Sequence, residues 1–477
     1  MMTLFFTDEL PEGPLITLEA MLEAREQRAG RQRGMREAYQ CAIVSFTLNI
    51  AGPIKRFALA DRAFEAGRAE IARQLERYGW ATVAESGIDR PTGLEALWAV
   101  EAAPLPLKRS MAAIEAGHPL GRLFDIDVIE PGGDQLNRRQ AGLPERGCLV
   151  CGKPGAGCAR SRAHPAEEVI KHSLAIMRGY FGDRLAGRAA NCAVRALLHE
   201  ACISPKPGLV DRFNSGAHRD MDIFTFMDSA SALSGYFRDI TLAGLISAQT
   251  PAEALLPQLR YPGMLAEDAM LAATGGVNTH KGLIFSLGIV CAALGQAHAL
   301  GGPPDIDALL EHCARIAAPA LDDLNRPGSA ATRGEALNMK YGVTGVRGEA
   351  AAGFPAARRW GLPVLKRRLA QGASLNDAGV AALLNLMARV NDTNIIGRSD
   401  MNTLQSLQAE LKERLKDDTK ASGGLIALAS ELDERLTAAN ISPGGCADLL
   451  SITLALHFME LEGLIANILT SKARQSP

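Results

Sequence analysis

The hydrophobic pattern of this 477-residue chain changes character once, between about residues 165 and 184. Before that point, Val44–Pro53 has the β-branched and aromatic residues of a strand, whereas Ala60–Tyr78 has apolar residues at helical spacing. After it, strand-like runs disappear, and Ala- and Leu-rich helices are expected at Arg188–Ile203, Ile223–Ser247, Lys281–Ala299, Ile306–Leu321, Ala378–Val390, Thr403–Leu415 and Ala447–Leu469. The pattern predicts an α+β domain at residues 1–180 and an all-α domain at residues 184–477.

The charge balance limits the partners of the chain. Lys and Arg total 51 against 53 Asp and Glu, which gives a formal net charge of −2. A protein that binds a nucleic-acid backbone needs a basic surface, and this composition does not indicate one. We therefore expect no nucleic-acid partner.

Cysteine usage and hydropathy indicate a cytoplasmic protein with reduced thiols. Nine cysteines are too few for a disulfide scaffold, and the first residues include acids where a secretory signal has an apolar core. Two apolar stretches, Gly282–Leu300 and Leu449–Leu469, approach the length of a membrane span. The first holds Ser, Gln, His and Gly, and the second carries Glu460 and Glu462, so we expect buried helices and no membrane segment.

Two acidic residues at strand spacing, Asp125 and Asp127, mark the first candidate site. Side chains two apart in a strand share one face, so both carboxylates would meet there. Nucleotidyl-transfer sites use such a pair to bind Mg²⁺ and hold a triphosphate while a hydroxyl attacks the α-phosphorus. The alternative is a pair of solvated acids on an edge strand. Two interpretations of the nearby Arg122, Arg138 and Arg139 are equally good: they neutralise phosphate charge, or they are scattered surface cations.

A basic run lies near the N-terminus, at Arg25, Arg28, Arg31, Arg33 and Arg36. Its first interpretation is a solvated helix face. A surface for phosphate or an acidic partner is the alternative.

Four soft or borderline metal ligands fall within 17 residues: Cys148, Cys151, Cys158 and His164. The surrounding loop is rich in Gly and Pro, which suits a tetrahedral zinc site. The spacing fits no common zinc-finger pattern. The alternative is a metal-free loop whose Arg and His side chains contact phosphate.

The first part closely resembles the apo-citrate lyase phosphoribosyl-dephospho-CoA transferases, also called holo-citrate lyase synthases. The resemblance is carried within residues 40 to 164 by SFTLNIAGPIK, GHPLGRLFDIDVI and RGCLVCGKPGAGCARSRAH. It implies a nucleotidyltransferase-like domain that moves a phosphoribosyl-dephospho-CoA group from its triphosphate precursor to a serine of the citrate lyase acyl carrier subunit, releasing diphosphate. Asp125 and Asp127 would then be catalytic and hold Mg²⁺. Lys55 and Arg122 are the candidates for triphosphate contacts.

A second group of polar residues lies between two predicted helices. It consists of Lys206, Asp211, His218, Asp220 and Asp222. Pro205, Pro207 and Gly208 prevent a continuous helix there, so these groups sit on a shaped loop. Convergent carboxylates with a lysine suit a metal-bound polyphosphate. For Asp220 or Asp222 alone, the alternative is the N-cap of the following helix.

The segment Gly275–Gly282 directly precedes an apolar helix and contains Asn278, His280 and Lys281. Free backbone N–H groups and the helix dipole favour phosphate at such a position, although the eight-residue Walker spacing is absent. A lone histidine is more often structural, but the polar neighbours of His280 favour a site role.

Two further polar clusters, Gly342–Ala350 with Arg347 and Glu349, and Asn391–Asn394, occur later in the chain. Each alone is explained as a helix cap. One shared cleft is the simpler interpretation of all of them.

The second part closely resembles triphosphoribosyl-dephospho-CoA synthases. The resemblance is carried between residues 200 and 394 by PKPGLVD, GAHRDMD, GGVNTHKGLIFSLG, GVRGEAAAGFP and NDTN. It implies that the ribose 2'-hydroxyl of 3'-dephospho-CoA attacks the anomeric carbon of ATP, so that adenine leaves and the triphosphate stays intact. Such chemistry needs a base, an acid and Mg²⁺. We expect metal or base duty from Asp211, Asp220 and Asp222, phosphate binding by Lys206, Asn278, Lys281 and Arg347, and proton transfer by His218, His280 or Glu349.

The two resemblances support each other, because the product of the second domain would be the substrate of the first. The sequence therefore predicts a bifunctional transferase that makes and attaches the citrate lyase prosthetic group. One alternative is maturation of a related carrier protein, such as that of malonate decarboxylase. Another is a non-catalytic regulator that binds nucleotide or CoA and contains a zinc module.

Overall fold

The computed structural model describes residues 11–300, 302–324, 333–416 and 422–466. The chain divides into two compact units, residues 1–182 and 183–477. Helix α5 (Ala166–Cys202) contains residues of both units and runs through the segment where the sequence pattern changes. Residues 1–10 and the end of the expected helix Ala447–Leu469, from residue 467 on, lie outside the described residues.

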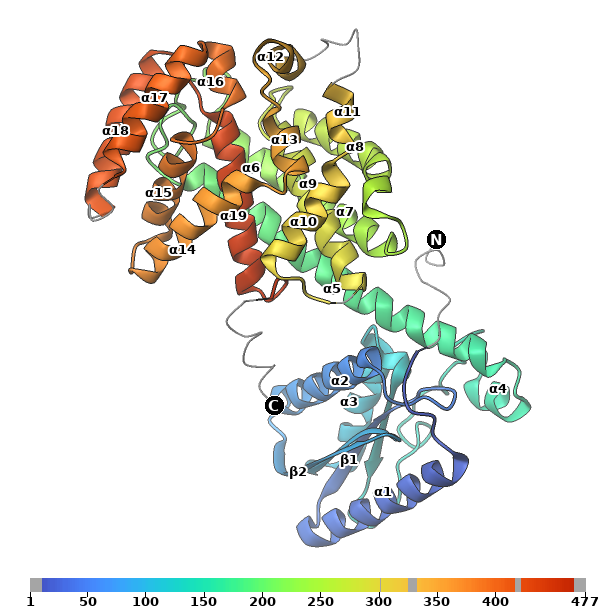
Figure 1. Ribbon diagram of the computed structural model, residues 1–477. Coiled ribbons are helices and arrows are strands. Elements are labelled where there is room, and N and C mark those ends of the chain that lie inside the picture. The colour runs from blue at the N-terminus through green and yellow to red at the C-terminus, as the bar shows by residue number, and fades with distance from the viewer. Residues whose placement is uncertain (1–10, 301, 325–332, 417–421, 467–477) are drawn as a thin grey trace. The chain divides into compact units, whose positions relative to one another are not determined.

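The N-terminal unit is built on a four-stranded antiparallel sheet with the strand order β2-β3-β1-β4. Helix α1 lies along one side of this sheet, and α2 and α3 lie on the other (Figure 1). The strands are β1 (Ala42–Leu48), β2 (Ala81–Arg90), β3 (Gly93–Glu101) and β4 (Phe124–Ile129). The helices are α1 (Leu18–Tyr39), α2 (Ala58–Arg77), α3 (Pro104–Gly117), α4 (Gly155–Ser161) and the 3₁₀ turn Gly121–Leu123.

Alternation along the strands gives the sheet two different faces. The larger core lies on the α2 and α3 side, where Phe46, Trp98 and Phe124 are buried. Gly67 of α2 allows close packing there, because a Cβ at this position would lie 2.4 Å from the Phe46 ring. The face toward α1 has a small apolar cluster that includes Ile43, and polar residues occupy the rest of it.

The described residues of the C-terminal unit form helices and the loops that join them. After α5 come α6 (Ile223–Ala232), α7 (Ser234–Ile246), α8 (Leu256–Ala273), α9 (Lys281–Leu300), α10 (Ile306–Ala317), α11 (Ala320–Leu324) and α12 (Arg333–Tyr341). These are followed by α13 (Gly345–Ala351), α14 (Leu362–Ala370), α15 (Leu375–Met387), α16 (Thr393–Arg398), α17 (Met401–Arg414), α18 (Ser422–Ala438) and α19 (Gly444–Leu461). Short turns precede α8 and α14, at Ala252–Ala254 and Ala357–Gly361.

Helix α9 is the centre of this unit and packs closely against α7. Two glycines make the approach possible: a Cβ at Gly244 would lie 2.0 Å from the Ala292 carbonyl oxygen, and one at Gly295 would lie 2.1 Å from that of Thr241. Helices α9 and α19 are long and apolar enough to cross a membrane, but 72% and 61% of their apolar windows are buried inside the structure. This burial is typical of core helices.

The predicted helices of the C-terminal unit are confirmed as helices, but several of their predicted boundaries are wrong. The expected helix Ile223–Ser247 is two helices that meet at Leu233. The expected helix Ile306–Leu321 is interrupted because Pro319 lies between α10 and α11 and cannot donate a backbone hydrogen bond. In the N-terminal unit, the expected strand Val44–Pro53 ends earlier, at Leu48.

Candidate active sites

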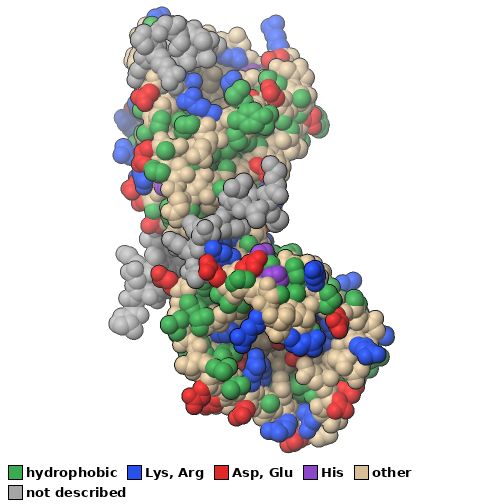
Figure 2. Space-filling view, turned by 90° about the vertical axis from the view of Figure 1, so that its right-hand side faces the viewer, with side chains coloured by type: hydrophobic (Ala, Val, Ile, Leu, Met, Phe, Trp, Pro, Cys, Tyr) green, Lys and Arg blue, Asp and Glu red, His purple; other side chains and the backbone are tan. Residues whose placement is uncertain are grey.

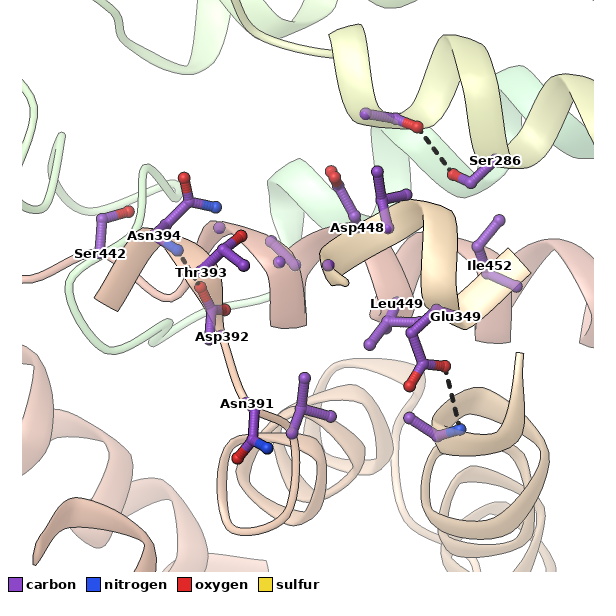
Figure 3. A pocket seen from close by; sticks show the side chains of 18 of the residues that line it. Ser286, Glu349, Asn391, Asp392, Thr393, Asn394, Ser442, Asp448, Leu449 and Ile452 are labelled. Atoms are coloured by element: carbon purple, nitrogen blue, oxygen red, sulfur yellow. Dashed lines mark hydrogen bonds between the residues drawn. The ribbon is translucent and has the colours of Figure 1, made fainter. Parts of the chain in front are cut away.

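A cavity of about 1040 Å³ opens in the C-terminal unit. Its walls come from the start of α9, from α13, from the segment between α15 and α16, and from the start of α19. Figure 3 shows side chains from these elements, among them Glu349, Asp392 and Asp448, around one space. Each of the polar clusters that are separate in the sequence therefore contributes some residues to one cavity.

The start of α9 presents Asn278 and Lys281 to this cavity. Gly275 and Gly276 have positive φ angles of 64° and 93°, so the loop turns where an L side chain would be strained. The Asn278 Oδ1 atom accepts a hydrogen bond from the Lys281 N–H at 3.3 Å. Lys281 pairs with Glu267 at 2.8 Å and keeps 59% of its side chain exposed. The helix N-terminus thus combines a partial positive charge with an exposed cation.

His280 is buried beside this helix start and lines the cavity. Its Nδ1 atom lies 2.7 Å from the Ser229 hydroxyl, which itself accepts a hydrogen bond from Thr279. The Nε2 atom is buried and has no hydrogen-bond partner. Burial lowers the pKa of His280 to about 3, and the Lys206 charge adds to the effect. The imidazole is therefore neutral at physiological pH.

Lys206 and His218 also line the cavity. Lys206 is held by Glu200 in a buried ion pair. The His218 Nε2 atom lies 2.9 Å from the Ser442 hydroxyl, and its Nδ1 atom lies 3.4 Å from the Arg398 guanidinium. Burial and the Arg398 charge lower the pKa of His218.

The three aspartates expected to share a metal do not converge. The Asp211 carboxylate accepts hydrogen bonds from the backbone N–H groups of its own loop, at Lys206, Phe213 and Asn214. Asp222 is the N-cap of α6 and forms a capping box with Thr225. Asp220 is largely exposed, 4.0 Å from His218. None of the three lines the cavity as described, so their metal role stays a prediction without geometric support.

Glu349 faces the cavity from α13. One of its oxygens accepts a hydrogen bond from the Ala356 N–H at 3.2 Å, and burial raises its pKa. Arg347 lies in the same helix but is not among the residues that line the cavity.

Several cavity residues were not predicted from the sequence. Asp448 of α19 lies against the first turn of α9, where a Cβ at Gly282 would come within 2.1 Å of its Oδ2 atom. Burial raises the pKa of Asp448 well above its usual range, and the charges of Glu200 and Asp392 add to this. Asp392 belongs to the predicted cluster Asn391–Asn394, and it anchors backbone by accepting hydrogen bonds from the N–H groups of Asn394 and Cys446 at 2.8 Å each. The cavity also contains three unpredicted cations, Arg359, Arg389 and Arg398.

The N-terminal unit contains a second, smaller pocket of about 140 Å³. Asp125 and Asp127 share one face of β4, as their spacing predicts, and Asp125 lines this pocket. Burial and the neighbouring Asp125 raise the pKa of Asp127. Figure 2 shows Lys and Arg side chains around a hollow on one face of this unit.

Helix α1 brings part of the basic run to the pocket. Arg25 and Arg28 line it with Asp125, and Arg28 and Arg31 pair with Glu95 of β3. The basic run is therefore not only a solvated face.

The two predicted triphosphate contacts of this unit lie in different surroundings. Lys55 lines the small pocket and donates a hydrogen bond to the Ile50 carbonyl at 2.5 Å. Burial and the Arg25 charge lower the pKa of Lys55. Arg122 donates a hydrogen bond to the Gly147 carbonyl and lies outside the pocket.

The four predicted zinc ligands come together. One ligand atom each from Cys148, Cys151, Cys158 and His164 lies within 4.8 Å of every other. It is the one His, Cys, Asp and Glu group of this kind among the described residues.

Comparison with known proteins identifies the two units. The family model for ATP:dephospho-CoA triphosphoribosyl transferase matches residues 186–465, more than half of the chain. The chain belongs to this triphosphoribosyl transferase family. The family model for apo-citrate lyase phosphoribosyl-dephospho-CoA transferase matches residues 16–179.

Some relatives of this chain match it over nearly its whole length. It is 35% identical to the protein CitXG of Haemophilus influenzae, over 96% of this chain and 99% of that protein. It is 30% identical to the protein CitXG of Leuconostoc mesenteroides, over 94% and 98%. A probable 2-(5''-triphosphoribosyl)-3'-dephosphocoenzyme-A synthase of Pectobacterium carotovorum is 42% identical, over 56% of this chain and 87% of that protein.

The large cavity falls within the triphosphoribosyl transferase match, and β4 and the Cys and His cluster fall within the other. The chain is therefore a transferase with two family domains, whose two activities belong to maturation of the citrate lyase prosthetic group.

Proposed function

We propose that the large cavity joins ATP to 3'-dephospho-CoA. The 2'-oxygen of the dephospho-CoA ribose forms a bond to the anomeric carbon of ATP, and the bond from that carbon to adenine breaks. The hydroxyl loses one proton, the departing adenine gains one, and the triphosphate is unchanged. The supporting observation is the convergence, in one cavity, of a cationic helix N-terminus with carboxyl groups of raised pKa.

The size and charge of the cavity suit these substrates. Pockets for one small molecule usually measure about 300 to 1,000 Å³, so a cavity of 1040 Å³ lies just above this range and suits a site for two adjacent nucleotides. We assign the ATP triphosphate to the start of α9, where Lys281 and the backbone N–H groups face the cavity. Arg359, Arg389 and Arg398 supply charge for the diphosphate of 3'-dephospho-CoA.

Glu349 and Asp448 are proposed as the acid–base pair. Both face the cavity, and both have a pKa raised by burial. Asp392 is held by several hydrogen bonds and Glu200 by its ion pair with Lys206. Glu349 and Asp448 are not held in this way. Groups with a pKa near the working pH are the most effective in general acid–base catalysis.

Mg²⁺ is proposed to enter this cavity with ATP. In the described residues of the C-terminal unit, no three carboxylates converge into a preformed cage. Mg²⁺ commonly keeps phosphate and water ligands with only one or two carboxylates, so such a cage is not required. When bound, the ion neutralises part of the triphosphate charge.

We propose that the N-terminal unit is a nucleotidyltransferase-like domain that uses this product. A serine hydroxyl of the citrate lyase acyl carrier subunit attacks the α-phosphorus and releases its proton, the bond from that phosphorus to the bridging oxygen breaks, and diphosphate leaves. Asp125 and Asp127 would hold Mg²⁺, because their carboxylates lie on one face of β4 beside the pocket. Arg25, Arg28 and Lys55 line the same pocket and would balance the phosphate charge.

Together, the two units would complete a cytoplasmic maturation pathway on one chain. The intermediate would be made at one site and used at the other, which raises its local concentration. The test is adenine formation from ATP with purified protein and Mg²⁺. Adenine should form only when 3'-dephospho-CoA is present, and binding of both compounds without adenine would contradict the synthase proposal.

The carrier is tested separately by intact-mass measurement. Citrate lyase acyl carrier subunit and malonate decarboxylase carrier are each incubated with the protein, ATP and 3'-dephospho-CoA. We expect the mass of the prosthetic group to be added to the citrate lyase carrier. Addition to the malonate decarboxylase carrier alone would favour the related pathway.

A further inference from the structure

The Cys and His cluster of the N-terminal unit has the geometry of a metal site. The Sγ atoms of Cys151 and Cys158 lie 3.6 Å apart, and all nine cysteines are free thiols. A disulfide needs about 2.05 Å between sulfurs, so this pair is too far apart to be bonded. The spacing instead leaves room for an ion between the sulfurs, as in sites with Zn–S bonds of about 2.3 Å.

The turn that contains the first two cysteines directs backbone N–H groups at their sulfurs. The Val150 N–H donates to the Cys148 Sγ at 3.4 Å, and the Lys153 N–H donates to Cys151. Gly152, between Cys151 and Lys153, has a φ of 72°, a conformation that L side chains rarely adopt. N–H donors stabilise thiolates, which are the metal-binding form of cysteine.

His164 is oriented as metal-binding histidines are. Its Nδ1 atom lies 3.4 Å from the Glu168 carboxylate. Its Nε2 atom is buried and makes no hydrogen bond of normal geometry. A carboxylate on one ring nitrogen commonly fixes the tautomer so that the other nitrogen can bind metal.

We propose that Cys148, Cys151, Cys158 and His164 bind one Zn²⁺ in a closed, structural site. Three sulfurs and an imidazole favour Zn²⁺ over the hard cations Mg²⁺ and Ca²⁺. Four protein ligands complete the tetrahedron, so no position remains for a substrate. The site is separate from the pocket that contains Asp125.

The position of the site gives the metal a role in the transfer reaction. Arg146, two residues before Cys148, donates hydrogen bonds to the carbonyls of Gly121 at 3.0 Å and Phe124 at 2.8 Å. It also pairs with Glu115, which accepts the Ile126 N–H. Since Phe124 and Ile126 flank Asp125, the loop holds the start of the strand that presents the two carboxylates. The cluster residues are therefore positioning residues, and the metal fixes the loop that holds β4.

The test is elemental analysis of the full-length protein, purified under reducing conditions without chelator. We expect about one zinc per chain. Cys148→Ser and Cys158→Ser should lose it, whereas Cys41→Ser, which removes a thiol outside the cluster, should retain it. Replacement by Co²⁺ should give the visible bands of tetrahedral cobalt thiolates, and these bands should be absent in Cys158→Ser.

Glu168→Gln provides a variant that keeps all four ligands and so avoids a folding failure. It should weaken zinc binding by about 10-fold to 100-fold in competition with a chelator. Zinc loss should reduce transfer to the carrier and leave adenine release unchanged. A zinc-free, reduced wild-type protein with full transfer activity would overturn the proposal, as would equal zinc content in wild type, Cys148→Ser and Cys158→Ser.

Discussion

The Lys206 Nζ atom lies 2.6 Å from the Glu200 carboxylate, and both side chains are at most 3% exposed. This ion pair joins the end of α5 to the loop that follows it, at the wall of the large cavity. The Lys206 N–H also donates to Asp211, so one residue holds both the cavity wall and the loop. A lysine predicted only to bind phosphate therefore has a structural role as well.

Lys206→Met should strongly destabilise the C-terminal unit. The change leaves the Glu200 charge buried without a partner, which typically costs about 3 to 5 kcal/mol. Urea unfolding followed by far-UV circular dichroism measures the loss, because this unit is helical. The double variant Glu200→Leu/Lys206→Met removes both charges and should recover most of the stability. If Lys206→Met is as stable as wild type, the ion pair between Glu200 and Lys206 does not stabilise the folded protein.

Asp448→Asn should reduce adenine formation by at least about 100-fold, because a positioned acid or base typically contributes that much. The matched control is Asp268→Asn, which changes an exposed carboxylate on α8. Transfer to the carrier from supplied triphosphoribosyl-dephospho-CoA should be normal in both variants. Undiminished adenine formation would remove Asp448 from the acid–base pair.

Asp448→Asn should also gain stability relative to wild type as the pH rises. The pKa of Asp448 is raised in the folded protein, so folding favours its protonated form. The stability that this group contributes is complete at low pH and is lost as the pH rises through the raised pKa. Asn carries no charge, so the melting temperature of Asp448→Asn relative to wild type should increase with pH over that interval. A difference independent of pH would contradict the burial of an ionisable Asp448.

Local patterns were sufficient to predict some parts of these sites. In β4, the polar Asp125 and Asp127 alternate with apolar residues. This alternation with a period of two predicts both the strand and its polar face. The Cys and His cluster was likewise visible as four ligands within one loop. In both cases the interacting groups are close in sequence.

Asp448 could not be predicted in this way. It lies in a helix whose other residues are mostly apolar, and nothing in its neighbourhood distinguishes it from a helix-start carboxylate. Its role follows from packing of α19 against the start of α9, more than 160 residues earlier. For Asp222 the sequence left a metal ligand and an N-cap as alternatives, and the structure shows the N-cap of α6.

Asp125→Asn should reduce transfer to the carrier by at least about 100-fold while adenine release continues. Removing one of two carboxylates from a metal site costs about 3 kcal/mol of transition-state stabilisation or more, which is about 100-fold in rate. Asp134→Asn, an exposed acid after the same strand, is the control and should transfer normally. Intact-mass measurement of the carrier and an adenine assay report the two activities in one sample. Loss of both activities would contradict the assignment of one activity to each unit.

The basic run of α1 gives a matched pair of variants. Arg25 and Arg33 are both exposed, but only Arg25 lines the pocket of Asp125. If the pocket holds the triphosphate, Arg25→Ala removes a charge-assisted contact and should raise the KM for the triphosphate precursor about tenfold. Arg33→Ala should leave KM unchanged, since screened surface charges contribute little. Equal KM values for Arg25→Ala and wild type would contradict phosphate binding by Arg25 and would favour a solvated helix face.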